Sequence, residues 1–274
     1  MERREPRRHF ETDAVVTAII LSKDRPAQLH LLLESIRRNA PEHISPVVIY
    51  KGNEQLYKNA APDTLLIPET DFQKQVSREI QLGCRYICFM ADDGILYRPY
   101  KGGAESALSA DGSLLCVSLR LGFNTTVCHP TGLEQTPPRN DYFLWAEQQG
   151  DFSYPGSIDA HIFRRTDLLQ MLDGRNFPNP TALECALVDA CEKRKNQMPF
   201  MAMYPHSCYV GNPVNRTSEQ SNVVYGLTHP TTISDALIWF DDGLRIDFDA
   251  MDFSNIQGAH HEVALKWTVK RSAG

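Results

Sequence analysis

The stretch AVVTAIIL at residues 14–21, continued by SKDRPAQLHLLLESIRRN at 22–39, decides the fold class of this chain. Its first part is a nearly continuous, β-branched apolar run, which is typical of a strand covered on both faces of a sheet. A polar turn follows at Ser22–Pro26, and apolar residues then recur at helical spacing at Leu29, Leu32 and Ile36. The stretch therefore predicts a central strand, a polar loop and a helix.

The next segments continue this alternation. A second apolar run, VVIY at 47–50, follows the helix and completes a βαβ unit, whose two strands we expect to be parallel. Asp71 predicts the N-cap of another helix, and Gly83 predicts its end. The run YICFM at 86–90 then predicts a third strand. Strands that alternate with helices predict an α/β fold.

Two adjacent carboxylates, Asp92 and Asp93, directly follow this third strand. Open α/β sheets bind their ligands at the carboxyl ends of strands. A divalent cation held by one or two carboxylates offsets the charge of a nucleotide diphosphate. The chain also contains Asp241-Asp242-Gly243, which follows a strand-like apolar run at 237–240. Only the first pair has a βαβ unit before it, so we expect the metal or nucleotide site there.

The second half of the chain offers candidates for acceptor chemistry. Residues 114–119 predict a strand, and 120–140 predict a long loop of the kind that contacts substrates. Thr166 predicts the cap of a short helix, and Asn179-Pro180 predict the start of another.

Two carboxylates of this half could take the proton of an acceptor hydroxyl in a reaction that inverts the anomeric centre. They are Asp159, within GSIDAHIFR at 156–164, and Glu184, near the start of the helix after Asn179-Pro180. The helix dipole alone also favours a glutamate near that end, so the role of Glu184 stays open. A retaining reaction needs no base at this place, and the sequence does not decide between the two outcomes.

Composition limits the function classes. The 274 residues carry 28 Lys and Arg against 34 Asp and Glu, a net charge of -6, which argues against broad nucleic-acid binding. The seven cysteines are odd in number and contain no Cys-x-x-Cys pair, so we expect reduced, mostly buried thiols and no zinc site. Without an apolar run of about 20 residues or a signal peptide, we expect a cytoplasmic protein with no membrane span.

Two segments carry a resemblance to a known family. IILSKDRPAQLHLLLESIRRN at 19–39 is similar to the opening of family-2-type GT-A glycosyltransferases, and CFMADDG at 88–94 resembles their Asp-x-Asp region. The resemblance implies a GT-A fold, with a Rossmann-like nucleotide-binding half, a mixed central sheet and an elaborated C-terminal acceptor region. The implied division is a basic tail at 1–12, a nucleotide-sugar-binding half at 13–119, and an acceptor-binding half with a C-terminal extension at 120–274.

The same resemblance implies roles for individual residues. Ser22, Lys23 and Arg25 are implied to lie along the nucleotide, with Asp92 near the ribose. Asp93 is implied to ligate Mn²⁺ or Mg²⁺. Where a third acidic residue can stand, this chain has an alanine, so the last metal ligand stays open among three histidines: His206, His260 and His261.

The implied function is transfer of a sugar from a UDP- or GDP-sugar donor to a hydroxyl of a carbohydrate or other acceptor, with a divalent metal at the diphosphate. One alternative is a sugar-phosphate nucleotidyltransferase, but its glycine-rich phosphate loop is absent from the turn Ser22–Pro26. The other is a catalytically inactive carbohydrate-binding or scaffold protein, because a fold alone does not prove activity.

Overall fold

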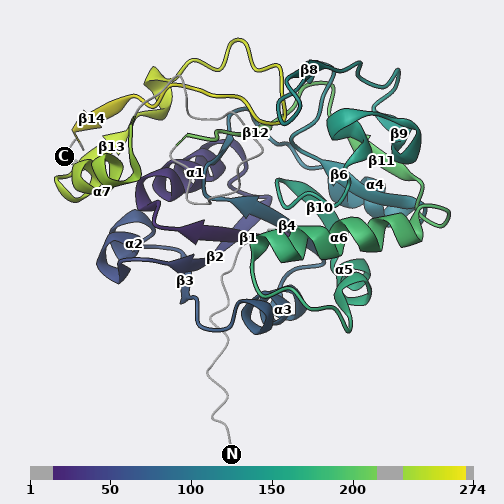
Figure 1. The fold of residues 1–274 in the computed structure, drawn as a ribbon, viewed down its shortest axis with the longest axis horizontal. Coiled ribbons are helices and arrows are strands. Elements are labelled where there is room, and N and C mark those ends of the chain that lie inside the picture. The colour runs from purple at the N-terminus through teal and green to yellow at the C-terminus, as the bar shows by residue number, and fades with distance from the viewer. Residues whose placement is uncertain (1–14, 215–230, 270–274) are drawn as a thin grey trace, which may run out of the picture.

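An eight-stranded sheet forms the centre of the structure, a computed structural model that describes residues 15–214 and 231–269 (Figure 1). In spatial order its strands are β3 (Leu65–Pro68), β2 (Ile44–Lys51), β1 (Val16–Lys23), β4 (Tyr86–Ala91), β10 (His161–Arg164), β6 (Leu114–Ser118), β11 (Phe200–Met203) and β9 (Tyr142–Leu144). The first four are parallel to one another, and β10 and β9 are antiparallel to their neighbours. The predicted α/β fold with a mixed central sheet is therefore confirmed.

The first βαβ unit matches the prediction from the sequence. β1 is buried over its whole length except Lys23, as expected for a strand covered on both faces. The helix α1 (Pro26–Asn39) begins with its proline in the first turn, where the missing N–H costs no hydrogen bond. β2 then pairs in parallel with β1, from Val16 opposite Ile44 to Lys23 opposite Lys51.

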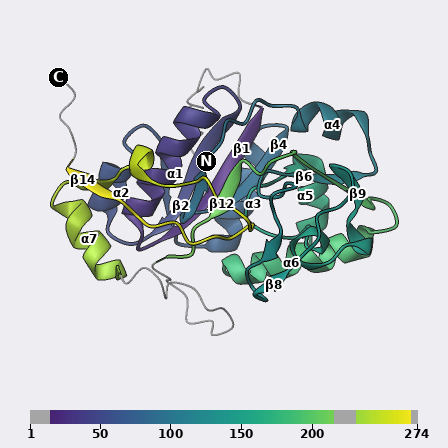
Figure 2. The ribbon, with the colours of Figure 1, turned by 90° about the horizontal axis from the view of Figure 1, so that it is seen from above.

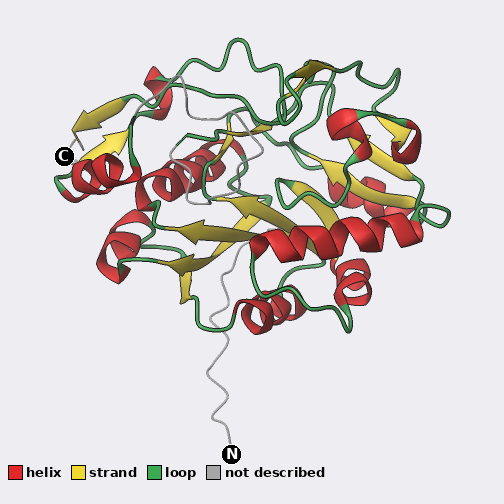
Figure 3. Ribbon diagram, in the orientation of Figure 1, coloured by secondary structure: helices red, strands yellow, loops and turns green. Residues whose placement is uncertain are grey.

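Helices cover both faces of the sheet (Figures 1 and 3). One face packs against α3 (Phe72–Leu82), α5 (Arg165–Leu172) and α6 (Pro180–Arg194), and the other packs against α1, α2 (Glu54–Ala60) and α4 (Ala104–Ala110). Two of the predicted helix starts are confirmed, because Asp71 caps α3 and Asn179 caps α6 through their side chains. Gly83 ends α3, as predicted.

A smaller third core lies on the outer side of α1 (Figure 2). It is built from β5 (Gly94–Leu96) paired with β12 (Tyr209–Gly211), β13 (Leu244–Ile246) paired with β14 (Trp267–Val269), the helix α7 (Ile233–Asp241) and a 3-10 turn at Phe248–Ala250. The prediction of a strand at 237–240 is wrong, since these residues form the end of α7. Thr232 and Asp235 make a capping box that starts a helix, and a short apolar run alone cannot distinguish the two structures.

The segment after β6 is largely irregular, as predicted. Within it, β7 (Val127–Cys128) and β8 (Leu133–Glu134) form a small hairpin, and 3-10 turns follow β9 at Trp145–Glu147 and Gly150–Ser153. The prediction that Thr166 caps a helix is wrong, because β10 runs directly into α5 and Arg164 occupies the cap position.

The remaining global expectations concern the tail, the cysteines and membrane spans. The tail at 1–12 lies outside the described residues. All seven cysteines are free thiols and five are buried, in agreement with the expectation. Across 15–214 and 231–269, every helix is too short or too polar to cross a bilayer. The division of the chain after residue 119 stays a prediction.

Candidate active site

The ends of β1 and β4 bring the first candidate residues together. The two strands are parallel neighbours with Leu21 opposite Ala91, so the residues that follow each strand meet at one edge of the sheet. The amide of Asp92 donates to the carbonyl of Leu21 at 3.2 Å, which holds the two ends side by side. Ser22, Lys23 and Asp92 therefore share one site, as the sequence predicted.

Asp92 lies at the centre of this edge with a fully buried side chain. Its Oδ2 accepts hydrogen bonds from Ser22 Oγ at 2.7 Å and from the Lys23 amide at 3.1 Å, and its Oδ1 forms an ion pair with the Arg25 guanidinium. Ser22 Oγ is also 2.8 Å from Tyr57 Oη, a buried group of α2. Burial raises the pKa of Asp92, and the charge of Arg25 opposes this shift. Both oxygens of Asp92 are thus engaged within the protein.

Asp93 is the more accessible carboxylate of the pair. Its side chain is 19% exposed, and its Oδ2 lies 2.8 Å from Arg25 Nη1, so one guanidinium contacts both aspartates. The Asn212 amide donates to the Asp93 carbonyl at 2.9 Å and fixes the backbone. Mg²⁺ and Mn²⁺ need only one or two carboxylates when waters and phosphates complete the shell. Asp93 fits such a ligand, whereas the enclosed Asp92 does not.

The described residues contain no group of three or more His, Cys, Asp or Glu side chains that could hold a metal. Where Asp93 serves as a ligand, phosphate oxygens and water could complete the shell of the cation. Lys23 and Lys51 are register partners at the ends of β1 and β2, and both are exposed at this edge. Their ammonium groups could pair with phosphate oxygens.

A second cluster surrounds Asp159, which precedes β10. Asp159 Oδ2 lies 3.0 Å from His260 Nε2 and 3.8 Å from Arg120 Nη1. Burial acts to raise the pKa of Asp159, but the hydrogen bond and charge of His260 and the charge of Arg120 outweigh it and lower that pKa to about 2. Burial acts to lower the pKa of His260, and Asp159 reverses this and raises it. The pair therefore favours the ionised carboxylate beside a protonated imidazole.

Arg120 anchors this cluster, and the sequence gave no prediction for it. Its side chain is buried, with Nη2 2.9 Å from Asp151 Oδ1 and Nη1 donating to Ser157 Oγ at 3.0 Å. Its place two residues after β6 was the available signal, since Asp92 likewise follows a buried strand. The neighbours of Arg120 come from loops, which explains why a pattern along the chain did not find them.

Glu184 lies beside this second cluster, in the second turn of α6. Burial and the charge of Asp159 raise its pKa, while Arg120, His260 and a hydrogen bond from the Ile158 amide oppose that shift. The structure thus brings Glu184 and Asp159 together from separate segments, with pKa shifts in opposite directions.

The buried Tyr209 of β12 connects the two clusters. Its pKa is raised by burial and by the charges of Asp159 and Asp93, so both carboxylates act on one side chain. Next to it, Gly211 forms a β-bridge with His260. Of the three histidines left open as metal ligands, His260 is thus engaged with Asp159, and the metal role of each stays a prediction.

Proteins similar to this chain are found among the solved structures. No protein-family model and no curated protein matches it. Among solved structures, it is similar to glucosyl-3-phosphoglycerate synthase from Mycobacterium tuberculosis in complex with Mn²⁺, uridine diphosphate and glucosyl-3-phosphoglycerate. The TM-score is 0.43 at 13% identity, over 69% of each chain. The same synthase with Mg²⁺ and uridine diphosphate gives a TM-score of 0.43 at 14% identity, over 69% of this chain and 68% of that one.

A further similar structure is described only as a mycobacterial protein, with a TM-score of 0.44 at 12% identity over 69% of this chain and 65% of that chain. Glucosyl-3-phosphoglycerate synthase is a glycosyltransferase of the GT-A fold. The similarity of this chain to these structures concerns the fold only.

Proposed function

We propose that the chain is a metal-dependent glycosyltransferase that moves a sugar from a UDP- or GDP-sugar to an acceptor hydroxyl. The observation that carries this proposal is the cluster at the ends of β1 and β4, where Arg25 joins a buried Asp92 to the accessible Asp93. A carboxylate held in this way at the ligand-binding edge of an α/β sheet suits a cation that neutralises phosphate.

In this proposal the donor diphosphate lies between Asp93 and the lysines at the ends of β1 and β2. Mn²⁺ or Mg²⁺ held by Asp93 would offset the negative charge of the departing diphosphate. Asp92 positions the turn Ser22–Arg25 through its hydrogen bonds rather than contacting the donor. Lys23 is the residue of that turn whose side chain is exposed and able to reach a phosphate.

For an inverting reaction, we assign the base to Glu184 and a supporting role to Asp159. The acceptor oxygen forms its bond to the anomeric carbon as the bond to the diphosphate breaks, and Glu184 takes the hydroxyl proton. Burial raises the pKa of Glu184, which strengthens it as a base, whereas His260 stabilises the charge of Asp159 and weakens its affinity for protons. For a retaining reaction, no base is required at Glu184.

The central test measures release of UDP from UDP-glucose by the purified protein with Mn²⁺, with and without excess chelator. UDP-glucose and Mn²⁺ are the first probes because solved structures of similar fold contain them. We expect chelation to abolish turnover, Mn²⁺ to restore it, and Asp93→Asn to lower it at least about tenfold, a loss of about 1.4 kcal/mol in transition-state stabilisation. Full turnover in chelator, or an active and folded Asp93→Asn variant, would refute the proposal.

Two further measurements separate the alternatives. A sugar-phosphate nucleotidyltransferase would release pyrophosphate from UTP and glucose 1-phosphate, and we expect none. A catalytically inactive carbohydrate-binding protein would give no UDP release with any nucleotide-sugar and acceptor. Release of pyrophosphate would replace the present proposal with the first alternative, and failure to release nucleoside diphosphate from every nucleotide-sugar and acceptor would replace it with the second.

A further inference from the structure

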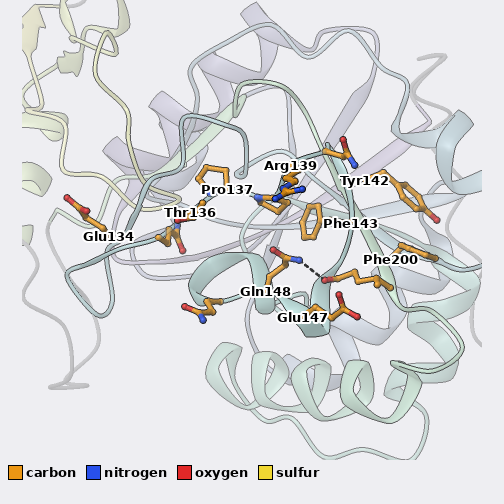
Figure 4. A pocket seen from close by; sticks show the side chains of 14 residues that line it. Glu134, Thr136, Pro137, Arg139, Tyr142, Phe143, Glu147, Gln148 and Phe200 are labelled. Atoms are coloured by element: carbon orange, nitrogen blue, oxygen red, sulfur yellow. Dashed lines mark hydrogen bonds between the residues drawn. The ribbon is translucent and has the colours of Figure 1, made fainter.

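An elongated pocket lies at the β9 edge of the sheet, apart from the residues described above (Figure 4). It has a volume of about 670 Å³ and is enclosed by the loop that precedes β9, by β9 itself and by the turn that follows. This volume is in the range of small-molecule sites. In Figure 4, the lining side chains extend from Glu134 and Thr136 at one end to Tyr142 and Phe200 at the other.

One end of the pocket presents an aromatic surface. Tyr142 is 37% exposed, and its ring lies against that of Phe200 with centroids 4.6 Å apart. A hydrogen bond from Tyr142 Oη to Asp111 fixes the ring in place. The negative face of an aromatic ring attracts the weakly positive C–H groups on one face of a pyranose ring.

The rest of the lining is polar and carries charges of both signs. Within 15–214 and 231–269, six of the polar lining side chains form no hydrogen bond or ion pair: Glu134, Thr136, Arg139, Asn140, Glu147 and Gln149. Such donors and acceptors suit the hydroxyl groups of a sugar. Because Glu134 and Glu147 outnumber Arg139, the lining favours a neutral polyhydroxyl ligand over a phosphate or a nucleic acid.

Buried hydrogen bonds fix this pocket relative to Asp159. Gln135, which lines the pocket, donates to Asp151 Oδ2 at 3.0 Å and accepts from the Asp151 amide at 2.9 Å. Asp151 in turn bonds to Arg120, which lies 3.8 Å from Asp159. The four side chains of Gln135, Asp151, Arg120 and Asp159 are buried and joined in series, so they hold the pocket and the carboxylate of Asp159 in a constant relation.

The distance between Asp159 and the pocket at β9 sets the size of the ligand. Asp159 precedes β10, and β9 is three strands away, at about 4.8 Å per strand or about 14 Å in all. The loop before β9 approaches from the edge of the sheet where the carboxylates lie, since Asp141 bonds to the last residue of β11. A single sugar at Asp159 does not span this separation, whereas a chain of several sugars does.

We propose that the pocket is a distal subsite for an oligosaccharide acceptor, with the reacting end at Glu184 and Asp159 and the remote sugars against Tyr142. This inference rests on the proposed function for its acceptor, but the pocket's affinity for sugar is measurable without donor or metal.

The test titrates the full chain with neutral malto-, cello-, chito- and manno-hexasaccharides and with their monosaccharides, by calorimetry in the absence of nucleotide. We expect at least one hexasaccharide to bind at least about tenfold more tightly than its monosaccharide, a difference of about 1.4 kcal/mol. Tyr142→Ala and Glu147→Ala should each weaken that binding, and Tyr142→Phe should retain it, because the ring face remains. Ile238→Ala, which removes an exposed apolar side chain of α7 outside the pocket, is the control.

Several results would overturn the subsite. In one, no hexasaccharide binds more tightly than its monosaccharide. In another, the wild type and folded Tyr142→Ala and Glu147→Ala variants bind the hexasaccharide with equal affinity. Binding of UDP with Mn²⁺ is measured in parallel and should be unchanged in both pocket variants. If oligosaccharide binds through Tyr142 but no donor is turned over, the subsite stands and the proposed transfer fails. If transfer proceeds with the same KM for long and short acceptors, the proposed transfer stands and the subsite fails.

Discussion

The sequence Asp-Asp-Gly occurs twice in this chain, each time after an apolar run, and its two copies have very different surroundings. At 92–94 the first aspartate is fully buried and both aspartates contact Arg25. At 241–243 both aspartates are exposed at the end of α7. The first copy ends a strand that has neighbours on both sides, and the second ends a surface helix. Converging elements, rather than the tripeptide itself, turn a carboxylate pair into a candidate site.

The two glycines are required for different reasons. A Cβ on Gly94 would lie 1.7 Å from Tyr209 Oη, so this glycine allows β5 and β12 to approach closely. A Cβ on Gly243 would meet nothing within 4 Å, but its φ of +90° disfavours other residues. The first glycine serves tertiary packing, and the second ends a helix.

The largest effect is expected for Asp92→Ala. Removing this carboxylate leaves the buried guanidinium of Arg25 with Asp93 alone and leaves Ser22 Oγ without its acceptor. Breaking a buried ion pair costs about 3–5 kcal/mol in the free energy of unfolding. Urea denaturation followed by circular dichroism measures this loss, with Asp242→Ala as the control, for which we expect no measurable change. Equal stability of the two variants would mean that Asp92 has no structural role.

Gly94→Ala should have the next largest effect. The added methyl group collides with Tyr209, and overpacking of this kind costs about 1–3 kcal/mol. Gly243→Ala should cost about 1 kcal/mol, through backbone strain alone. A double-mutant cycle with Tyr209→Leu distinguishes overpacking from backbone strain. The Tyr209→Leu substitution should reduce the cost of Gly94→Ala and leave the cost of Gly243→Ala unchanged. Additive costs at Gly94 would contradict the packing explanation.

A smaller effect on stability is expected at His260, in the C-terminal segment. His260 forms a β-bridge with Gly211 and lies beside Asp159. The pKa of His260 is raised from 6.5 in the folded state, so its stabilising contribution is complete below pH 6.5 and is lost as the pH rises through the folded pKa. Asp159, with a pKa of about 2, loses its contribution only in acid, as the pH falls below about 4.

The wild type should therefore lose stability relative to His260→Gln as the pH is raised from about 6 to 9, by about 1.4 kcal/mol for each unit of pKa shift. Denaturation with urea at several pH values measures this difference. A flat difference between wild type and His260→Gln would show that the imidazole gains no proton affinity from Asp159.

Periodicity in the sequence was sufficient for most elements of the fold from β1 to β4. β1, α1, β2, α3 and β4 were predicted because each has a clear apolar pattern, with start and stop residues beside several of them. The short α2 and β3, which lie between β2 and α3, were not predicted. The resemblance to GT-A glycosyltransferases depended on the same segments. α7 was missed because its apolar run is short and its capping box lies five residues before that run.

The candidate site was predictable only where its residues lie at the end of a strand or directly after it. Ser22, Asp92 and Asp93 met as expected, since parallel neighbouring strands end at one edge. The partnership of Arg25 with both aspartates depends on side-chain direction, which periodicity does not contain. The pairing of Asp159 with His260 joins residues 101 apart in sequence through loops, so no local pattern indicated it.

The smallest effect, near zero, is expected when the second Asp-Asp pair is changed. Asp241→Asn and Asp242→Asn should leave the affinity for UDP with Mn²⁺ within about threefold of wild type, because substitution of an exposed carboxylate changes stability and binding little. Titration calorimetry measures this affinity, and Asp93→Asn in the same buffer should weaken it at least about tenfold. Asn removes the charge and keeps the side-chain volume, so a loss at Asp93 reports electrostatics rather than packing. If instead the later pair controls metal-dependent UDP binding and Asp93→Asn is mild, the site lies at the end of α7. The ion pairs of Arg25 with Asp92 and Asp93, at the ends of β1 and β4, would then have a structural role only.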